Sequence, residues 1–166
     1  FMEVMAEVSD RSVRELGGRV GFLPRQVPAD VHAAESIAER THEPCTVLKD
    51  EYTTSEFLSL VGNMDLMLAI RLHALIFAGV MGVPMIGVSY DPKIDRFLDS
   101  IGEKPVGSLD DVTADELMAE VRRKWNDKAV FRKRNAELLA KLRDLAARNA
   151  ELALQLIGNQ EKGTRR

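Results

Sequence analysis

Residues that form crosslinks or bind metals are scarce in this sequence. Cys45 is the single cysteine among 166 residues, which excludes an internal disulfide and a zinc site built from several cysteines. The three histidines, His32, His42 and His73, do not stand at metal-ligand spacing from nearby carboxylates. We therefore expect no metal, and the near absence of cysteine is typical of a reducing, cytoplasmic environment.

Long hydrophobic runs are also missing. No apolar run approaches the roughly 18 residues of a membrane-spanning helix, and the first residues lack the basic-then-apolar pattern of a secretory signal. A hydrophobic content of 45% in 166 residues is enough for one well-buried core and short for two. These features predict a soluble chain with one main domain.

The first residues already carry a helical pattern. Met5, Val8, Val13 and Leu16 follow helical spacing from Phe1 onward, and no capping residue precedes them. We expect the chain to be a piece of a longer protein, so that part of any active site lies on residues outside it.

Short apolar runs then alternate with helical patterns. The predicted strands are 20–23, 45–48, 66–70 and 85–89, with 106–109 as a further edge strand, and the predicted helices between them include 29–40, 55–61 and 92–98. A further helix begins after Thr113, because an acid follows this capping residue three positions later. Nearly continuous apolar strands that alternate with helices predict an α/β fold with a doubly wound, Rossmann-like parallel sheet.

Polar residues that follow the predicted strands are the candidate site, because α/β sheets bind ligands beyond the carboxyl ends of their strands. If strands 66–70 and 85–89 are neighbours, then Arg71, His73 and Lys93 converge on one pocket, which suits a small anion with several charges. Each residue also has a structural explanation: Arg71 in an ion pair with Asp65 or Asp95, His73 in the core, and Lys93 at the surface. The other strand ends carry Arg25, Gln26, Asp50, Glu51, Tyr52, Ser89, Tyr90 and Asp91.

The stretch AIRLHALIFAGVMGVPMIGVSYDPKIDRFLDSIG, Ala69–Gly102, resembles the C-terminal half of bacterial polysaccharide pyruvyl transferases, especially those acting on secondary cell-wall polymers. The resemblance rests on Arg71-Leu72-His73, on the small-residue helix that ends at Gly82-Val83-Pro84, and on Ser89-Tyr90-Asp91-Pro92-Lys93, and it extends more weakly from Val20 to about Trp125. It implies a fold similar to GT-B glycosyltransferases, of which this chain is the C-terminal, donor-binding domain without its N-terminal partner.

The resemblance also implies an activity. Enzymes of this family transfer pyruvate from phosphoenolpyruvate onto two hydroxyls of a sugar, often N-acetylmannosamine, which forms a cyclic ketal and releases phosphate. Phosphoenolpyruvate is a co-substrate, so no cofactor is expected. The acceptor is a lipid-linked saccharide, and the finished polymer anchors surface-layer proteins in several Gram-positive bacteria.

Roles for individual residues follow from this chemistry. Arginine suits a bidentate contact with an oxyanion and lysine a point charge on phosphate, so Arg71 and Lys93 are predicted to hold the donor, with Arg25 as a third cation. His73 is predicted to protonate the enol carbon or the leaving phosphate oxygen, and Asp91 to take a proton from the sugar hydroxyl. The predicted donor-binding set also includes Ser89 and Tyr90.

Two other functions remain open on sequence grounds. A GT-B glycosyltransferase or sugar-nucleotide epimerase domain would bind a UDP-sugar in the same crevice, although Gly79 and Gly82 are too few for a glycine-rich phosphate loop. A flavodoxin-like interaction module without enzymatic activity is the other alternative. We expect no nucleic-acid partner.

The last segment differs in charge from the rest. Residues 1–121 contain 10 Lys and Arg against 21 Asp and Glu, whereas residues 122–166 contain 13 against 5. This basic segment is either a solvated helical face or a surface for an anionic membrane, which would place the protein at the inner face of the membrane. We divide the chain into a domain at 1–130 and a basic helix at 131–166.

An apolar stripe runs along the predicted C-terminal helix. Its positions alternate steps of three and four residues from Phe131, with two asparagines in the stripe: Asn135, Leu138, Leu142, Leu145, Asn149, Leu152 and Leu156. The stripe either packs on its own protein, including the absent domain, or joins two copies in a homo-oligomer.

Overall fold

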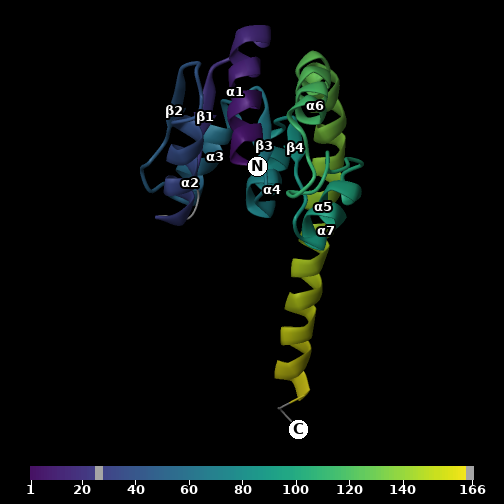
Figure 1. The fold of residues 1–166 in the computed structure, drawn as a ribbon. Coiled ribbons are helices and arrows are strands. Elements are labelled where there is room, and N and C mark those ends of the chain that lie inside the picture. The colour runs from purple at the N-terminus through teal and green to yellow at the C-terminus, as the bar shows by residue number, and fades with distance from the viewer. Residues whose placement is uncertain (25–27, 164–166) are drawn as a thin grey trace.

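Parallel strands and helices alternate along the chain in the computed structural model, which describes residues 1–24 and 28–163 (Figure 1). Side chains of the last helix are described up to 141 and at 144, 147–149, 151, 152 and 154. The elements are α1 (Met2–Leu16), β1 (Val20–Phe22), α2 (Ala29–Ala38), β2 (Cys45–Val47), α3 (Thr54–Gly62), β3 (Met67–Ala69), α4 (Leu72–Met81), β4 (Met85–Gly87), α5 (Pro92–Ser100), α6 (Ala114–Asn126) and α7 (Lys128–Gly163).

Local sequence signals explain where the helices begin and end. Thr53 and Thr113 each form a capping box, in which the threonine hydroxyl accepts a hydrogen bond from the backbone N–H three residues later and a glutamate side chain accepts one from the threonine N–H. Pro92 occupies the first position of α5, and Gly82 ends α4 in the left-handed conformation with φ 71°. The α/β class predicted from the sequence is confirmed, and the four strands predicted before residue 90 form in the predicted order.

The single continuous sheet predicted from the sequence does not form among the described residues. Instead, β1 pairs with β2 in parallel, with Phe22 opposite Val47, and β3 pairs with β4 in parallel, with Ala69 opposite Gly87. The two pairs are separate two-stranded sheets. Sequence patterns identify strands but not which edges meet, and here a cavity lies between β1 and β3.

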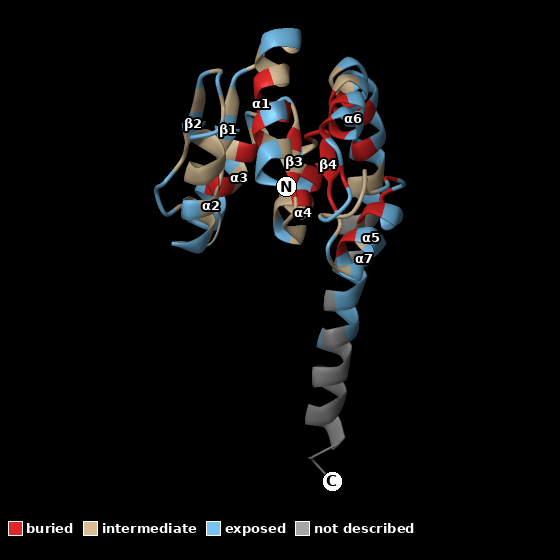
Figure 2. Ribbon diagram, in the orientation of Figure 1, coloured by how far each residue is buried: buried red, intermediate tan, exposed pale blue. Residues whose placement is uncertain are grey.

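Helices cover both faces of the β3–β4 pair. Successive residues of a strand point to opposite sides, so each face of the pair contributes its own side chains to a core. On one side, Met67, Ala69 and Met85 pack with residues of α3, α4 and α5. On the other side, Ile86 and Val88 pack with residues of α1 and α6. The buried residues accordingly concentrate around β3, β4 and the helices beside them (Figure 2).

The predicted edge strand at 106–109 is reduced to an isolated bridge. Ser89 pairs with Ser108, and the backbone N–H of Val106 donates to the carbonyl of Gly87 at 2.9 Å. Gly107 lies against Val112, with a hypothetical Cβ only 3.3 Å from the Val112 Cβ.

The long helix α7 packs on the domain at its beginning and then extends away from it (Figure 1). Phe131 is buried in the same cluster as α3 and α4, and Asn135 Nδ2 donates to the carbonyl of Gly79 at 2.6 Å, near the end of α4. Within the described residues, none of the helices, α7 included, is both long and apolar enough to cross a membrane.

Candidate anion-binding edge

The carboxyl ends of β3 and β4 lie side by side. Because Ala69 is paired with Gly87 in a parallel ladder, the chain leaves both strands at the same edge, and two residues later it reaches Arg71 on one side and Ser89 on the other. The assumption that these two strands are neighbours is therefore confirmed. We call the surface formed by Arg71, His73, Tyr90, Asp91 and Lys93 the carboxyl edge.

Arg71 is held at this edge by a carboxylate that the sequence did not suggest. Its Nη2 lies 2.6 Å from Oδ1 of Asp30, at the start of α2, and the two side chains are 43% and 19% exposed. The hydrogen bond that Arg71 donates to Asp30 raises the pKa of Arg71 above its ordinary value, burial opposes this, and Tyr90 adds a smaller raising effect. Arg71 does not pair with Asp65, which instead contacts Lys128 at 2.8 Å.

The contact between Arg71 and Asp30 joins the two halves of the structure. Asp30 follows the carboxyl end of β1, and Arg71 follows the carboxyl end of β3, so these strands end at the same side of the molecule. The two residues are 41 positions apart, which is why spacing within the sequence could not reveal the pair.

The other half of the carboxyl edge is the start of α5. Asp91 is the N-cap of this helix, and its Oδ1 accepts a hydrogen bond from the backbone N–H of Lys93 at 2.8 Å. The Lys93 ammonium is 3.9 Å from Oδ2 of Asp91, and its side chain is 73% exposed. Tyr90 is 55% exposed, so this part of the edge is open to solvent.

The remaining predicted site residues lie in different settings. His73 is exposed in the first turn of α4 and is not a core histidine. Ser89 is held through its backbone, which donates to the carbonyl of Gly107 and accepts from the N–H of Leu109, both at 2.9 Å. Arg25, the third predicted cation, lies outside the described residues.

The N-terminus of α4 carries a cation. Its N-cap is Arg71, with an extended backbone at φ −97° and ψ 124° and no capping hydrogen bond from its side chain. The N-cap residues of α1 and α2 also make no such bond, whereas α3, α5 and α6 are capped by Thr53, Asp91 and Thr113. The first backbone N–H groups of a helix attract anions, and here the N-cap residue adds a positive side chain.

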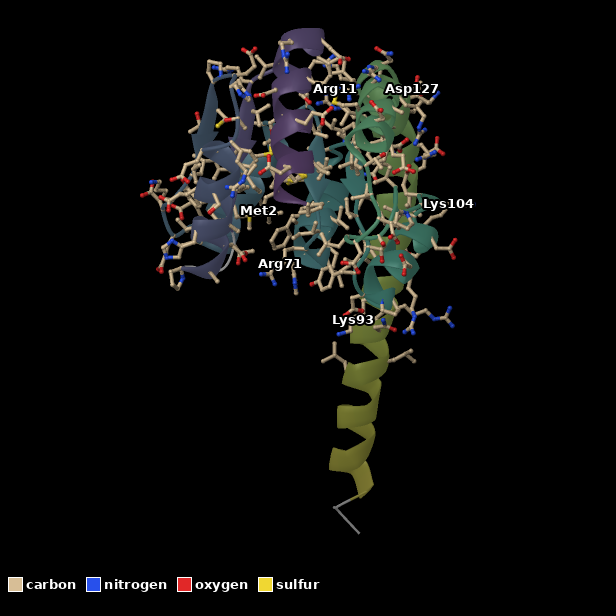
Figure 3. The ribbon with its side chains drawn as sticks, viewed as in Figure 1. Met2, Arg11, Arg71, Lys93, Lys104 and Asp127 are labelled. Carbon is tan, nitrogen blue, oxygen red and sulfur yellow. The ribbon has the colours of Figure 1, made fainter. Side chains whose placement is uncertain are left out.

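Figure 3 shows the resulting arrangement. Arg71 and Lys93 both lie toward the lower end of the domain, whereas Arg11 and Asp127 lie at the opposite end. Two cations, from the starts of two adjacent helices, thus accompany two helix N-termini at one open edge. Such an edge can bind the oxyanions of a small ligand. Among the described residues, no three His, Cys, Asp or Glu side chains gather in a way that could hold a metal ion.

The sequence model of one protein family, polysaccharide pyruvyl transferase, matches residues 5–92, which is more than half of the chain. The chain belongs to the polysaccharide pyruvyl transferase family. The match runs from α1 to the first residue of α5, so it includes Arg71, His73 and Asp91 and ends one residue before Lys93. No curated protein and no solved structure matches the chain.

Membership of the pyruvyl transferase family supports the family resemblance read from the sequence, and with it a transferase that takes part in polysaccharide pyruvylation. The matched segment contains β1 to β4 and every residue of the carboxyl edge except Lys93. The roles of individual residues at this edge stay predictions.

Proposed function

We propose that this chain is the donor-binding part of a pyruvyl transferase and that the carboxyl edge binds phosphoenolpyruvate. The observation that carries the proposal is the position of Arg71 at the N-cap of α4, whose strand β3 pairs with β4 and so lies next to the strand that leads to Lys93 at the start of α5. A ligand with a carboxylate and a phosphate matches two separate cations better than a ligand with one charge does.

The proposed reaction adds two hydroxyls of one sugar to the central carbon of phosphoenolpyruvate. The terminal CH2 of the donor gains one hydroxyl proton and becomes a methyl group, the bond from the central carbon to the phosphate oxygen breaks, and inorganic phosphate leaves with the second proton. The product is a cyclic pyruvate ketal. The proposed acceptor is a lipid-linked saccharide, with N-acetylmannosamine as the proposed sugar.

The residues of the carboxyl edge divide this work. Arg71 contacts one oxyanion of the donor while Asp30 keeps its guanidinium in place, and Lys93 contacts the other. Tyr90 lies beside Arg71 and Ser89 lies at the end of β4, where both add polar contacts to the donor. His73, exposed in the first turn of α4, donates a proton to the enol carbon or to the leaving phosphate oxygen.

Asp91 has two roles in this proposal. Its Oδ1 is already engaged as the cap of α5, which holds Lys93 in the first turn of that helix. Its other carboxylate oxygen, Oδ2, is the proposed base that takes the proton of the sugar hydroxyl. The proposal also includes a GT-B arrangement, in which the acceptor binds to a second domain, and a cytoplasmic location next to the membrane that carries the acceptor.

Calorimetric titration tests the donor. The chain is titrated with phosphoenolpyruvate and, in a separate experiment, with UDP-sugars. The proposal predicts heat of binding with phosphoenolpyruvate alone, whereas binding of a UDP-sugar alone would favour a glycosyltransferase or epimerase domain. Binding of neither ligand would favour an interaction module without enzymatic activity.

Substitutions locate the site. We expect Arg71→Ala and Lys93→Ala each to weaken phosphoenolpyruvate binding by about tenfold to a hundredfold, because a hydrogen bond to a charged group contributes roughly 1.5–3 kcal/mol. Lys104→Ala removes the same charge as Lys93→Ala from an exposed position away from the carboxyl edge (Figure 3) and is the matched control. Equal effects of Lys93→Ala and Lys104→Ala would show that only the overall charge matters.

The proton step has its own test. His73→Ala in the enzyme with both domains present is expected to lower turnover strongly while donor affinity changes little, because His73 acts on protons and not on the oxyanions. Near-normal turnover of His73→Ala would remove this residue from the mechanism.

A further inference from the structure

The two strand pairs leave a cavity of about 780 Å³ between β1 and β3. One lateral wall is β1 and the other is β3, while α1 closes one face and residues of α3 and α4 close the other. Apolar side chains from both helical layers line it, among them Met5, Val8, Leu16, Phe57 and Ala74. A space bounded by strand edges on two sides and by helices on the other two has the position of a β-strand within a covered sheet.

Backbone groups of both strands face this cavity. In β3, the N–H of Met67 donates to Pro84 and the carbonyl of Ala69 accepts from Val88, so the residue between them, Leu68, presents its backbone to the opposite side. In β1, the carbonyl of Phe22 accepts from the N–H of Leu48, so the neighbouring Gly21 presents its backbone away from β2. Both inner edges therefore offer hydrogen-bonding groups to a strand between them.

The direction of that strand is set by the pairs beside it. The ion pair of Arg71 with Asp30 spans the carboxyl ends of β3 and β1, so these two strands end at the same side. A strand that runs parallel to both can form parallel ladders on each edge. The result is one five-stranded parallel sheet in the order β2, β1, inserted strand, β3, β4.

The position of α1 identifies which segment the strand belongs to. α1 contacts α2, so the two helices lie on the same face, and the unit β1–α2–β2 moves away from the cavity. Parallel strand–helix–strand connections are right-handed. Because α1 and α2 cover the same face, the step from the inserted strand through α1 to β1 must therefore run across the sheet in the same direction as the step from β1 through α2 to β2. Its first strand then lies on the cavity side of β1, where α1 stands between the two strand pairs (Figure 1).

We propose that the cavity between β1 and β3 holds a parallel, apolar β-strand that is followed directly by α1 in the same polypeptide. The strand completes the sheet and ends at the carboxyl edge, next to Arg71 and Asp30. Arg71 and Asp30 also line the cavity, so the inserted strand adjoins the carboxyl edge at this end.

A fusion tests the proposal. A designed segment of about five alternating valine and isoleucine residues, followed by a glycine-serine turn of about four residues, is placed before Phe1. A matched segment with proline at its second and fourth strand positions is the control, because proline cannot donate to either ladder. Backbone amide exchange and thermal unfolding are measured for three proteins: the original chain, the chain with the designed segment and the chain with the proline segment.

We expect the designed strand to slow amide exchange at Gly21 and Leu68 by about a hundredfold or more, whereas Met67, which already donates to Pro84, serves as the internal reference. The unfolding midpoint should rise by roughly 10 °C, and the proline segment should leave both quantities near those of the original chain. Equal exchange with the two segments would overturn the proposal.

Two other outcomes would also overturn it. If the original chain is a dimer by sedimentation and already protects Gly21 and Leu68, a second copy covers the strand edges. If a small apolar dye binds the cavity and the designed strand does not displace it, the cavity takes a small ligand. None of these results depends on whether the chain binds phosphoenolpyruvate.

Discussion

Substitution of Glu103 by glutamine should destabilise the fold strongly, because it leaves a lysine buried without its main partner. Lys124 in α6 is only 4% exposed and contacts Oε2 of Glu103, which is 7% exposed, while Arg134 in α7 contacts the other carboxylate oxygen. The three residues join the turn after α5 to the two last helices. Burial lowers the pKa of Lys124 to about 8, and Arg123 adds to this effect. The direct contact with Glu103 offsets part of the cost of the buried ammonium.

The size of the effect has two bounds. Removal of one partner from a buried ion pair typically costs about 3–5 kcal/mol. Lys124 can escape part of this cost by losing its proton, which at pH 7 costs only about 1.4 kcal/mol for a lysine whose pKa is about 8. Glu120 Oε1, 3.9 Å from the Lys124 ammonium, also remains. We therefore expect Glu103→Gln to lower the free energy of unfolding by roughly 2 kcal/mol, a value between these two bounds.

Urea unfolding followed by circular dichroism measures this difference, provided that the slope with denaturant is unchanged. Glu120→Gln is the control, since Glu120 is 21% exposed and pairs mainly with Arg123, and it should cost no more than about 1 kcal/mol. The double substitution of Glu103 by leucine and Lys124 by methionine should recover most of the loss. A loss under about 1 kcal/mol for Glu103→Gln would refute the reasoning.

Three further predictions concern packing, pH and the last helix. Gly87→Ala should destabilise the fold by about 1–3 kcal/mol, because the new Cβ would lie 2.6 Å from a methyl group of the buried Leu98. Gly21→Ala, whose Cβ would lie 3.9 Å from the nearest atom, should not destabilise it, and thermal unfolding of the two variants measures the difference. Burial alone would raise the pKa of Asp10, but hydrogen bonds from Glu43 and His42 lower it. The free energy of unfolding of the wild type should therefore exceed that of Asp10→Asn by a constant amount above pH ~5, and this difference should disappear as the pH falls below ~4. A difference that grows in acid would contradict this. Asn135→Ala should cost about 1–2 kcal/mol in urea unfolding, since Gly79 loses one of two hydrogen-bond donors.

The sequence was sufficient to predict almost every element of the fold. Threonine with glutamate three residues later marked the start of α6, Pro92 marked the start of α5, and Gly82 marked the end of α4. The same capping signal at Thr53 and Glu56 was missed, although the helix itself was predicted. These signals are local, because a cap or a turn involves only the residues within one turn of a helix. The pairing of β3 with β4 followed from the rule that consecutive strands are usually adjacent.

Contacts between distant residues were beyond the reach of such patterns. Asp30 reaches Arg71 across 41 positions, and the separation of β1 from β3 depends on what lies between them. The separate domain assigned to 131–166 also could not anticipate that Phe131 and Asn135 pack on the body of the protein. This packing confirms that the apolar stripe of the C-terminal helix contacts its own domain at its beginning, while Asn149 and Leu152 of the same stripe are exposed.

The uneven charge of the chain has a partly internal explanation. Basic residues that follow position 121 meet acidic residues of the preceding domain: Arg122 hydrogen-bonds to Glu15 at 2.7 Å, and Lys128 contacts Asp65 at 2.8 Å. These exposed ion pairs contribute little stability individually. They do show that part of the basic segment is complementary to its own domain. For the later basic residues of α7, a solvated helical face and a contact with an anionic membrane both stay predictions.

The central claim is that the edge formed by the starts of α4 and α5 binds the donor. It is tested most directly by following backbone amide NMR signals of the chain as phosphoenolpyruvate is added. The account predicts that signals of Leu72, His73 and Lys93 shift together with one dissociation constant, and that Arg71→Ala greatly weakens this response. Saturable shifts confined to residues elsewhere, with these three signals unmoved, would contradict it.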